Sequence, residues 1–240
     1  LAGLVHDSRG HVEQRVTQVE AHRASVPYMR ITKFGHACVR VEHDGVAVVV
    51  DPGVFTDAEA VDGADAVLIT HEHMDHYLAD HLRATDTPIW TIEAVARKIR
   101  EEAPDVAERV TVVSPEESFD VGLRVRAVGE LHAVIHPEMP RFDNSGYVIV
   151  AGDQRVYHPG DALTLPGEQV DLLLVPVSAP WMRASEGVDF ARAVKAPRNL
   201  AIHDRVYSEA GLGIVDGHMN AFLPGEGLEY VRLADGKDLT

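Results

Sequence analysis

The sequence predicts a mixed α/β domain, and its pattern is compatible with two β-sheets that pack face to face with helices outside. Apolar runs of strand length recur along the chain, and several precede segments of helical length. The two halves of the chain each carry several strands followed by helices. With 240 residues, of which 45% are hydrophobic and 25% charged, the chain can bury a sizeable core.

Residues 1–28 are predicted to be an N-terminal extension of a single domain at 29–240. Val12, Val16 and Val19 fall at helical spacing in a polar stretch, which gives one narrow apolar stripe. Such a stripe needs a surface to cover, so we expect a helical arm docked on the body or on another subunit of a homo-oligomer. A start-site artefact is the alternative.

The body is expected to begin with three antiparallel strands. Residues 30–34 and 37–42 have the composition of strands, and 46–50 is a continuous apolar run. Asp44-Gly45 separates the second and third runs, and Asp-Gly between such runs is a strong hairpin signal. The third strand is predicted to end at Asp51-Pro52-Gly53, because proline and glycine interrupt a sheet.

The later elements follow a strand, helix, strand order. A second hairpin is expected at Gly152-Asp153. Each candidate metal ligand named below comes just after one of the predicted strands. The further strands are expected at 66–70, 88–92, 109–113, 123–128, 147–150, 155–157, 170–177 and 199–202, and the helices at 77–82, 93–102 and 186–194.

Four potential metal ligands follow the apolar run 66–70 within six positions. They are His71, His73, Asp75 and His76. In an extended chain residues i and i+2 point to the same side, so His71 and His73 can face one point. A single histidine on a polar loop is usually just solvated, but imidazoles and carboxylates at this density are typical of metal sites. The sequence therefore predicts a metal centre at the end of a buried strand.

The motif His71-x-His73-x-Asp75-His76 after an apolar strand resembles the metal signature of the metallo-β-lactamase superfamily. The chain is most similar to the stand-alone branch that includes ascorbate-6-phosphate lactonase. The resemblance implies a four-layer αββα sandwich of two mixed β-sheets with the helices outside. It runs from about Met29 to about Met219, through Gly35-His36-Ala37, Asp51-Pro52-Gly53, Gly160-Asp161 and Ile202-His203-Asp204.

The same resemblance implies two divalent metal ions. One would be bound by His71, His73 and His132, the other by Asp75, His76 and His203, with Asp161 as the bridge. His136 is an alternative to His132, but His132 is closer to the end of strand 123–128. Zinc suits histidine and aspartate ligands best, and Mn²⁺ or Fe²⁺ would also be accepted.

The predicted activity is that of a metal-dependent hydrolase. A bound divalent metal lowers the pKa of water to about 7, so a metal-bridging hydroxide could attack a small ester, lactone or phosphorylated metabolite. Asp75, or a metal-bound water, would protonate the leaving group. The candidate substrate-binding residues are His36, His136, Arg141, Trp181 and Arg183. An arginine among them could clamp a phosphate or carboxylate, whereas His36 could equally make a structural hydrogen bond.

Charge and cysteine content narrow the choice of partners. The net charge of −16 disfavours nucleic acid, which is held mainly by lysine and arginine. The single cysteine, Cys38, excludes an internal disulfide and is expected to be a small buried hydrophobe. No apolar run is long enough to span a membrane and no secretory signal pattern is found, so we expect a cytoplasmic enzyme with a small-molecule substrate.

Three rival functions compete with the small-molecule hydrolase. A phosphodiesterase or nuclease of the same superfamily is the first, and a nuclease should show a basic face or a basic domain. An oxygen-reducing di-iron protein is the second; its family pattern carries Glu where this chain has His73, and a flavin-binding domain usually follows. A non-catalytic metal-binding protein is the third, and only metal analysis with an activity assay excludes it.

Overall fold

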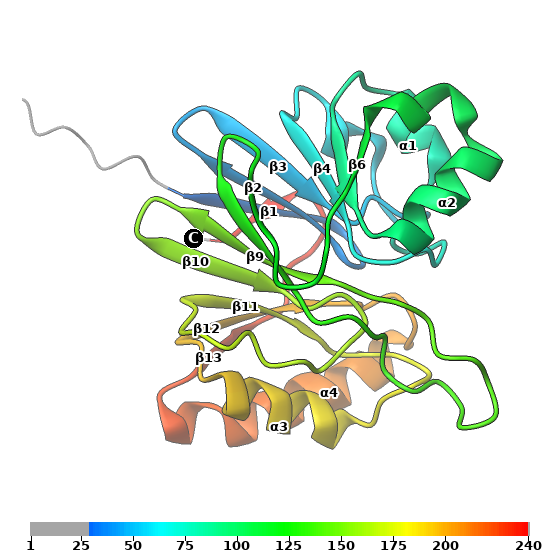
Figure 1. Cartoon of the computed structure of the whole chain (residues 1–240). Coiled ribbons are helices and arrows are strands. Elements are labelled where there is room, and N and C mark those ends of the chain that lie inside the picture. The colour runs from blue at the N-terminus through cyan, green and yellow to red at the C-terminus, as the bar shows by residue number, and fades with distance from the viewer. Residues whose placement is uncertain (1–28, 240) are drawn as a thin grey trace, which may run out of the picture.

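The structure is a computed structural model that describes residues 29–239. Within that range two seven-stranded β-sheets face each other and helices lie on both outer sides (Figure 1). This four-layer αββα arrangement confirms the predicted fold class. The predicted arm at 1–28 lies outside the described residues.

The first sheet brings together the two ends of the described chain. Its strand order is β14-β1-β2-β3-β4-β5-β6. Neighbours from β14 to β3 are antiparallel, and neighbours from β3 to β6 are parallel. The strands are β1 (Arg30–Gly35), β2 (Cys38–His43), β3 (Val46–Val50), β4 (Ala66–Ile69), β5 (Ile89–Thr91), β6 (Val110–Val112) and β14 (Lys237–Asp238).

The second sheet has the order β13-β12-β11-β10-β9-β8-β7. Its neighbours are parallel from β13 to β10 and antiparallel from β10 to β7. The strands are β7 (Ser118–Asp120), β8 (Arg124–Val128), β9 (Gly146–Ala151), β10 (Gln154–His158), β11 (Leu172–Pro176), β12 (Arg198–Ile202) and β13 (Glu229–Val231).

Helices cover the outer face of each sheet (Figure 1). On the first sheet lie α1 (Ala79–Arg83) and α2 (Glu93–Glu102), and on the second lie α3 (Ala184–Val194) and α4 (Glu209–Phe222). Short 3₁₀ helices connect other elements: η1 (Ala58–Val61), η2 (Pro104–Arg109) and η3 (Pro224–Glu226). None of the helices within the described range combines the length and apolar character needed to cross a membrane.

Strand β4 has a continuously apolar sequence and is buried on both faces. Ala66 and Leu68 belong to the cluster of buried side chains between the two sheets. Val67 and Ile69 point to the opposite face and pack beneath α1 and α2. Because both faces of β4 are covered, polar residues do not alternate with apolar ones along it. Cys38 is fully buried in the same outer cluster, as predicted, and burial raises the pKa of its thiol.

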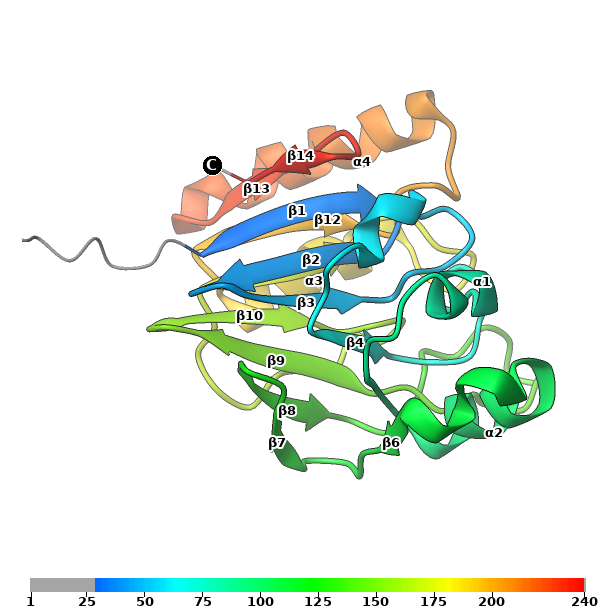
Figure 2. The same ribbon diagram turned by 90° about the horizontal axis from the view of Figure 1, so that it is seen from above.

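The parallel strands carry the functional segments to one end of the molecule. In Figure 2 the arrowheads of β4, β10 and β12 point the same way. Backbone hydrogen bonds tie these ends together across the two sheets, from Ser145 N–H to the Thr70 carbonyl and from His203 N–H to the His36 carbonyl (both 3.0 Å). Ligand sites of open α/β sheets commonly lie beyond the carboxyl ends of strands.

Most predicted elements are confirmed within a few residues. The helix at 93–102 coincides with α2, and both hairpins form, at Asp44-Gly45 and at Gly152-Asp153. The helix predicted at 77–82 is displaced, because residues 71–78 first form a turn that returns the chain to the site. Strands β7, β13 and β14 and helix α4 were not predicted from the sequence. Glycines inside α4 weaken its intrinsic helical preference, and it is stabilised by packing against the second sheet.

Candidate metal centre

The segment after β4 presents four candidate ligands from one tight turn. The backbone N–H groups of His76 and Tyr77 both donate to the His73 carbonyl, at 3.0 and 2.9 Å. This turn directs His73 to one side of the cluster and His76 to the other. Gly53 lies directly beneath it, where a Cβ atom would stand 2.0 Å from the Asp75 carbonyl oxygen. A glycine at position 53 is therefore required for the turn to pack on the loop after β3.

The first group of converging side chains consists of His71, His73, His132 and Asp161. His71 Nε2 lies 3.0 Å from His73 Nδ1, and His132 Nε2 lies 3.4 Å from Asp161 Oδ2. All four donor atoms lie within 4.8 Å of one another. Thus two residues from the β4 turn meet two residues delivered by the second sheet.

The second group consists of His36, Asp75, His76 and His203. His203 Nε2 lies 3.4 Å from Asp75 Oδ2. Asp161 contacts this group too, because its Oδ1 lies 3.1 Å from His76 Nε2 and its Oδ2 lies 3.2 Å from His203 Nε2. Asp161 therefore stands between the two groups, in the position expected of a bridging carboxylate.

His36 belongs to the second group but is oriented as a hydrogen-bond donor. Its Nδ1 accepts the backbone N–H of Arg205 at 3.2 Å, so the proton of the neutral ring is on Nε2. That Nε2–H donates to Asp75 Oδ2 at 3.1 Å. The ring is fully buried. His36, a predicted substrate-binding residue, thus contacts Asp75, which agrees with the structural alternative.

The rings of His71 and His76 are fixed by hydrogen bonds on the side away from the cluster. His76 Nδ1–H donates to Asp51 Oδ2 at 2.7 Å. The Thr70 hydroxyl donates to the same carboxylate, also at 2.7 Å, and therefore accepts from His71 Nδ1–H at 3.0 Å. When both histidines are neutral, the unprotonated Nε2 of each faces the cluster. Such partners are typical behind metal-bound histidines, because they set the tautomer and the ring orientation.

The rings of His132 and His203 are fixed in the same way, by hydrogen bonds to backbone carbonyls. His132 Nδ1–H donates to the Ala133 carbonyl at 2.7 Å, and His203 Nδ1–H donates to the Ser178 carbonyl. Each Nε2 then turns a lone pair toward an oxygen of Asp161, which is also an acceptor. When the rings are neutral, two acceptors at such distances repel each other unless a cation, either a proton or a metal ion, lies between them.

Several buried polar atoms of the cluster have no hydrogen-bond partner among the described residues. Buried polar groups are normally paired, so these atoms indicate an absent partner. Imidazole nitrogens and carboxylate oxygens converging in this way fit divalent metal ions such as zinc. The unpaired atoms are His76 Nε2, His132 Nε2, His203 Nε2 and Asp161 Oδ1.

The carboxylates of Asp75 and Asp161 favour positive charge within the cluster. Burial disfavours ionisation of Asp75, but the neighbouring His203 ring and the hydrogen bond from His36 outweigh it and lower its pKa. Burial likewise disfavours a charged His203, yet the Asp161 carboxylate more than compensates and raises the pKa of His203 to about 9. The carboxylates therefore stabilise positive charge beside His203 Nε2, whether it is a proton on that nitrogen or a bound metal ion.

Of the remaining predicted site residues, two lie beside the cluster of candidate ligands and two lie away from it. Trp181 and Arg141 lie beside the cluster, since Trp181 Nε1 donates to Asp161 Oδ2 at 2.9 Å and Arg141 Nε donates to the His132 carbonyl at 2.6 Å. His136 is exposed, and its Nδ1 accepts the Glu138 N–H. Arg183 starts α3 with its side chain 83% exposed, paired with Glu186.

Asp51 belongs to the Asp51-Pro52-Gly53 motif but was not predicted to act at the site. The signal available in the sequence was its position, since it is a carboxylate directly after the buried strand β3. In the structure its φ of 53° lies in the left-handed region, which is uncommon for residues other than glycine. Asn144 also supports the site. Its amide donates to the Pro159 carbonyl and its Oδ1 accepts the Asp161 N–H at 3.0 Å, which fixes the turn that carries Asp161.

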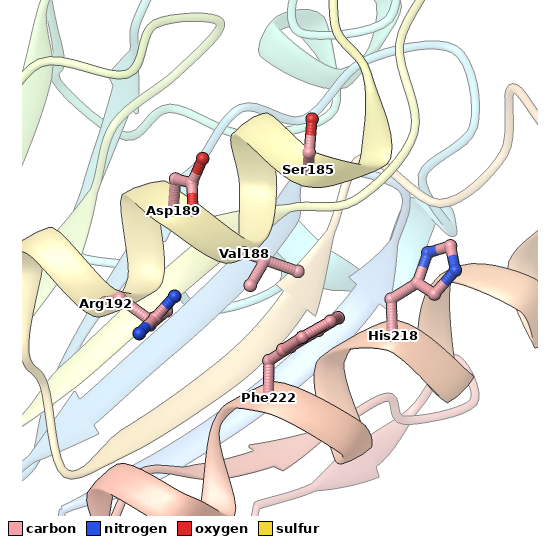
Figure 3. A pocket seen from close by; sticks show the side chains of 6 residues that line it. All are labelled: Ser185, Val188, Asp189, Arg192, His218 and Phe222. Carbon is pink, nitrogen blue, oxygen red and sulfur yellow. The ribbon is translucent and has the colours of Figure 1, made fainter.

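A separate cavity of about 220 Å³ lies between α3 and α4, outside the second sheet (Figure 3). Val188 and Phe222 point into it from the two helices. Its polar residues include Arg192, which pairs with Glu226. Because the cavity is on the helical face, it belongs to no part of the metal centre.

We expect Trp181→Phe to weaken metal binding. The change keeps most of the ring but removes the N–H that orients Asp161, and the loss of such a partner costs about 10-fold to 100-fold in metal affinity. Titration of metal-free protein with Zn²⁺ measures it. Trp90→Phe is the matched control, because Trp90 packs on Phe119 in the inter-sheet core. Equal affinities in the two variants would contradict the role of the indole N–H.

Comparisons with known proteins agree with this geometry. Residues 30–203 match a family model described as a β-lactamase superfamily domain. Protein Rv0786c of Mycobacterium tuberculosis is 38% identical over 203 residues, which cover 80% of this chain and 91% of that protein. A UPF0173 metal-dependent hydrolase of Aeropyrum pernix is 28% identical over 200 residues, covering 71% and 79%.

Solved structures share the fold at lower identity. Igni18, a metallo hydrolase of Ignicoccus hospitalis, superimposes with a TM-score of 0.69 at 16% identity, over 88% of this chain and 97% of its own. CmlA, a diiron β-hydroxylase of Streptomyces venezuelae, gives 0.67 at 16% identity, over 89% and 54%. Because these two proteins differ in chemistry, their similarity to this chain supports the shared fold alone. From the family match and the shared arrangement of sheets, the chain belongs to the metallo-β-lactamase superfamily and is a metal-dependent hydrolase.

Proposed function

We propose that the chain is a dinuclear hydrolase of a small ester, lactone or phosphorylated metabolite. The observation that carries the proposal is the pair of donor groups that share one carboxylate. The first ion would be held by His71, His73 and His132, and the second by Asp75, His76 and His203, with Asp161 between them. Zinc is the preferred ion for this set, and Mn²⁺ or Fe²⁺ would also be accepted.

The charge of the site supports two ions. With neutral imidazoles, the ligands contribute only the two negative charges of Asp75 and Asp161, which two divalent ions would exceed. The positive surplus would attract the oxygen of a carbonyl or phosphoryl group. Bound divalent metal supplies a hydroxide nucleophile at neutral pH and polarises that substrate oxygen.

The protein residues then have distinct tasks. His36 holds the Asp75 carboxylate through its Nε2–H, and Asp51 and Thr70 fix the rings of His76 and His71. Because its pKa is lowered, Asp75 is ionised in the resting protein. As the nucleophile attacks, Asp75 would take up its proton and pass it to the oxygen of the leaving group.

The test is metal analysis of protein purified without chelator, combined with assays on lactones, esters and phosphodiesters. We expect two ions per chain and a hydrolytic activity that chelators abolish and metal restores. A stoichiometry that never exceeds one, even after reconstitution, would overturn the dinuclear assignment. A fully loaded protein inactive on every substrate class would favour the non-catalytic metal-binding protein.

The substrate panel should begin with lactones, because the sequence motifs predict a likeness to the branch that includes ascorbate-6-phosphate lactonase. Phosphodiesters test the first rival function. The cytoplasmic location, the lack of nucleic-acid or membrane partners and a homo-oligomeric state stay predictions.

A further inference from the structure

A second cavity, of about 400 Å³, adjoins the metal centre at the loop 133–142. Two contacts join it to the site: the Phe142 ring lies 4.5 Å from that of His73, measured between ring centres, and Ala133 N–H donates to the Asp161 carbonyl at 2.7 Å. Its volume is within the range of small-molecule pockets. A molecule reacting at the metals could therefore extend into this cavity, which we call the loop pocket.

The wall of the loop pocket is mainly apolar. Val134 and Met139 remain 50% and 48% exposed, although apolar side chains of this size gain free energy when covered. None of the lining residues is acidic. The apolar lining consists of Ala133, Val134, Ile135, Met139 and Phe142, together with Pro137 and Pro140. This wall suits a hydrocarbon portion of a ligand.

Arg141 places one positive charge in the loop pocket. Its Nε is tethered to the His132 carbonyl, which fixes the guanidinium next to the metal centre. Within residues 29–239 no carboxylate is paired with Arg141, unlike Arg126, which contacts Glu116 and Glu168. The terminal amino groups of Arg141 are thus available to an anion. In a chain of net charge −16, such an arginine next to a pocket is a specific attraction for a negatively charged ligand.

We infer that the loop pocket recognises the non-reacting part of the substrate, a short hydrocarbon portion with an anionic group that pairs with Arg141. This inference rests on the proposed function and narrows its substrate class. The anionic group is a carboxylate or a phosphate, since a guanidinium pairs with both. The bond to be hydrolysed would then lie over the metal centre while the anion and the hydrocarbon lie in the loop pocket.

The test uses three probes of equal chain length, hexanoate, hexyl phosphate and 1-hexanol, titrated calorimetrically into metal-loaded protein. We expect at least one anion to bind about tenfold or more tightly than the alcohol, and Arg141→Gln to remove that preference. Hexanoate and hexyl phosphate distinguish the two anionic groups. Affinities are compared only between variants that retain the metals, so any direct contact of an anion with metal is common to them.

Three variants separate recognition from structural damage. Arg141→Lys keeps the charge and should restore part of the affinity. Arg97→Gln, which removes an exposed arginine of α2, should leave it unchanged. Val134→Ser should reduce the gain per methylene between butanoate and hexanoate, expected at about twofold to fourfold in the native protein. Metal content is measured for each variant.

The outcomes also separate this inference from the proposed hydrolase. Anion binding that is equal in Arg141→Gln and native protein, with metal content intact, overturns the inference even if hydrolysis is found. Arg141-dependent binding without any metal-dependent hydrolysis would uphold the loop pocket and contradict the enzyme. Loss of metal in Arg141→Gln would assign Arg141 to support of His132 and also overturn the inference, unless Arg141→Lys restores metal and anion binding together.

Discussion

His132→Ala is expected to deplete the metal centre and to lower turnover by at least about a hundredfold. The imidazole is fully buried, its Nε2 is unpaired, and its Nδ1–H is fixed by the Ala133 carbonyl. Removal of a partner behind a ligand already costs about 10-fold to 100-fold in affinity or activity, so removal of the ligand itself should cost more. Metal content and the rate of hydrolysis are the measurements.

His136→Ala is the matched control, four residues away on the same loop. His136 is exposed, lines the loop pocket and belongs to neither donor group. We expect its removal to leave the metal content unchanged and to alter mainly substrate affinity. The ligand assignment is wrong if metal is lost from the His136 variant and retained in the His132 variant.

Gly53→Ala is expected to disturb the centre from beneath. The new methyl group would lie 2.0 Å from the Asp75 carbonyl oxygen and 2.5 Å from the His76 nitrogen, so the ligand-bearing turn must move. Overpacking of this kind destabilises proteins by about 1–3 kcal/mol. Because Asp75 and His76 would shift, metal affinity should fall by about tenfold or more. Chemical denaturation and a zinc titration measure the two effects.

Gly217→Ala provides the comparison for Gly53→Ala. Gly217 is an exposed residue of α4, and a methyl group on its Cα would have open space within 4 Å beyond the helix's own backbone. Alanine is preferred to glycine inside a helix by about 0.5–1 kcal/mol, so this variant should be slightly more stable and should bind metal normally. Similar losses in both variants would contradict a steric cause at Gly53.

The ligand-bearing turn was predictable from sequence because its signal is local. Strand β4 and the four candidate ligands after it are contiguous, and the buried strand positions the turn. His132, Asp161 and His203 are single residues far apart in the chain. They were assigned through the family resemblance, and strand spacing favoured His132 over His136. The structure brings all three together with the turn.

The partners that orient the ligands were not predictable in the same way. Asp51 meets His76 across 25 residues and Trp181 meets Asp161 across 20. His36 contacts Asp75 only because β1 and β4 belong to one sheet. No residue spacing encodes such contacts, since they depend on how the strands are ordered. Helix α4 was missed for a related reason, because its stability comes from packing rather than from its glycine-containing sequence.

The proposed ligands come from both sheets: His71, His73, Asp75 and His76 follow β4, whereas His132, Asp161 and His203 follow strands of the second sheet. Ions bound between these ligands would link the two sheets, so folding and metal binding would form one coupled equilibrium. At a free-metal concentration about 100 times the dissociation constant, such coupling adds about 2.7 kcal/mol to the free energy of unfolding. The lifetime of the protein in the presence of proteases would then depend on the metal supply of the cell.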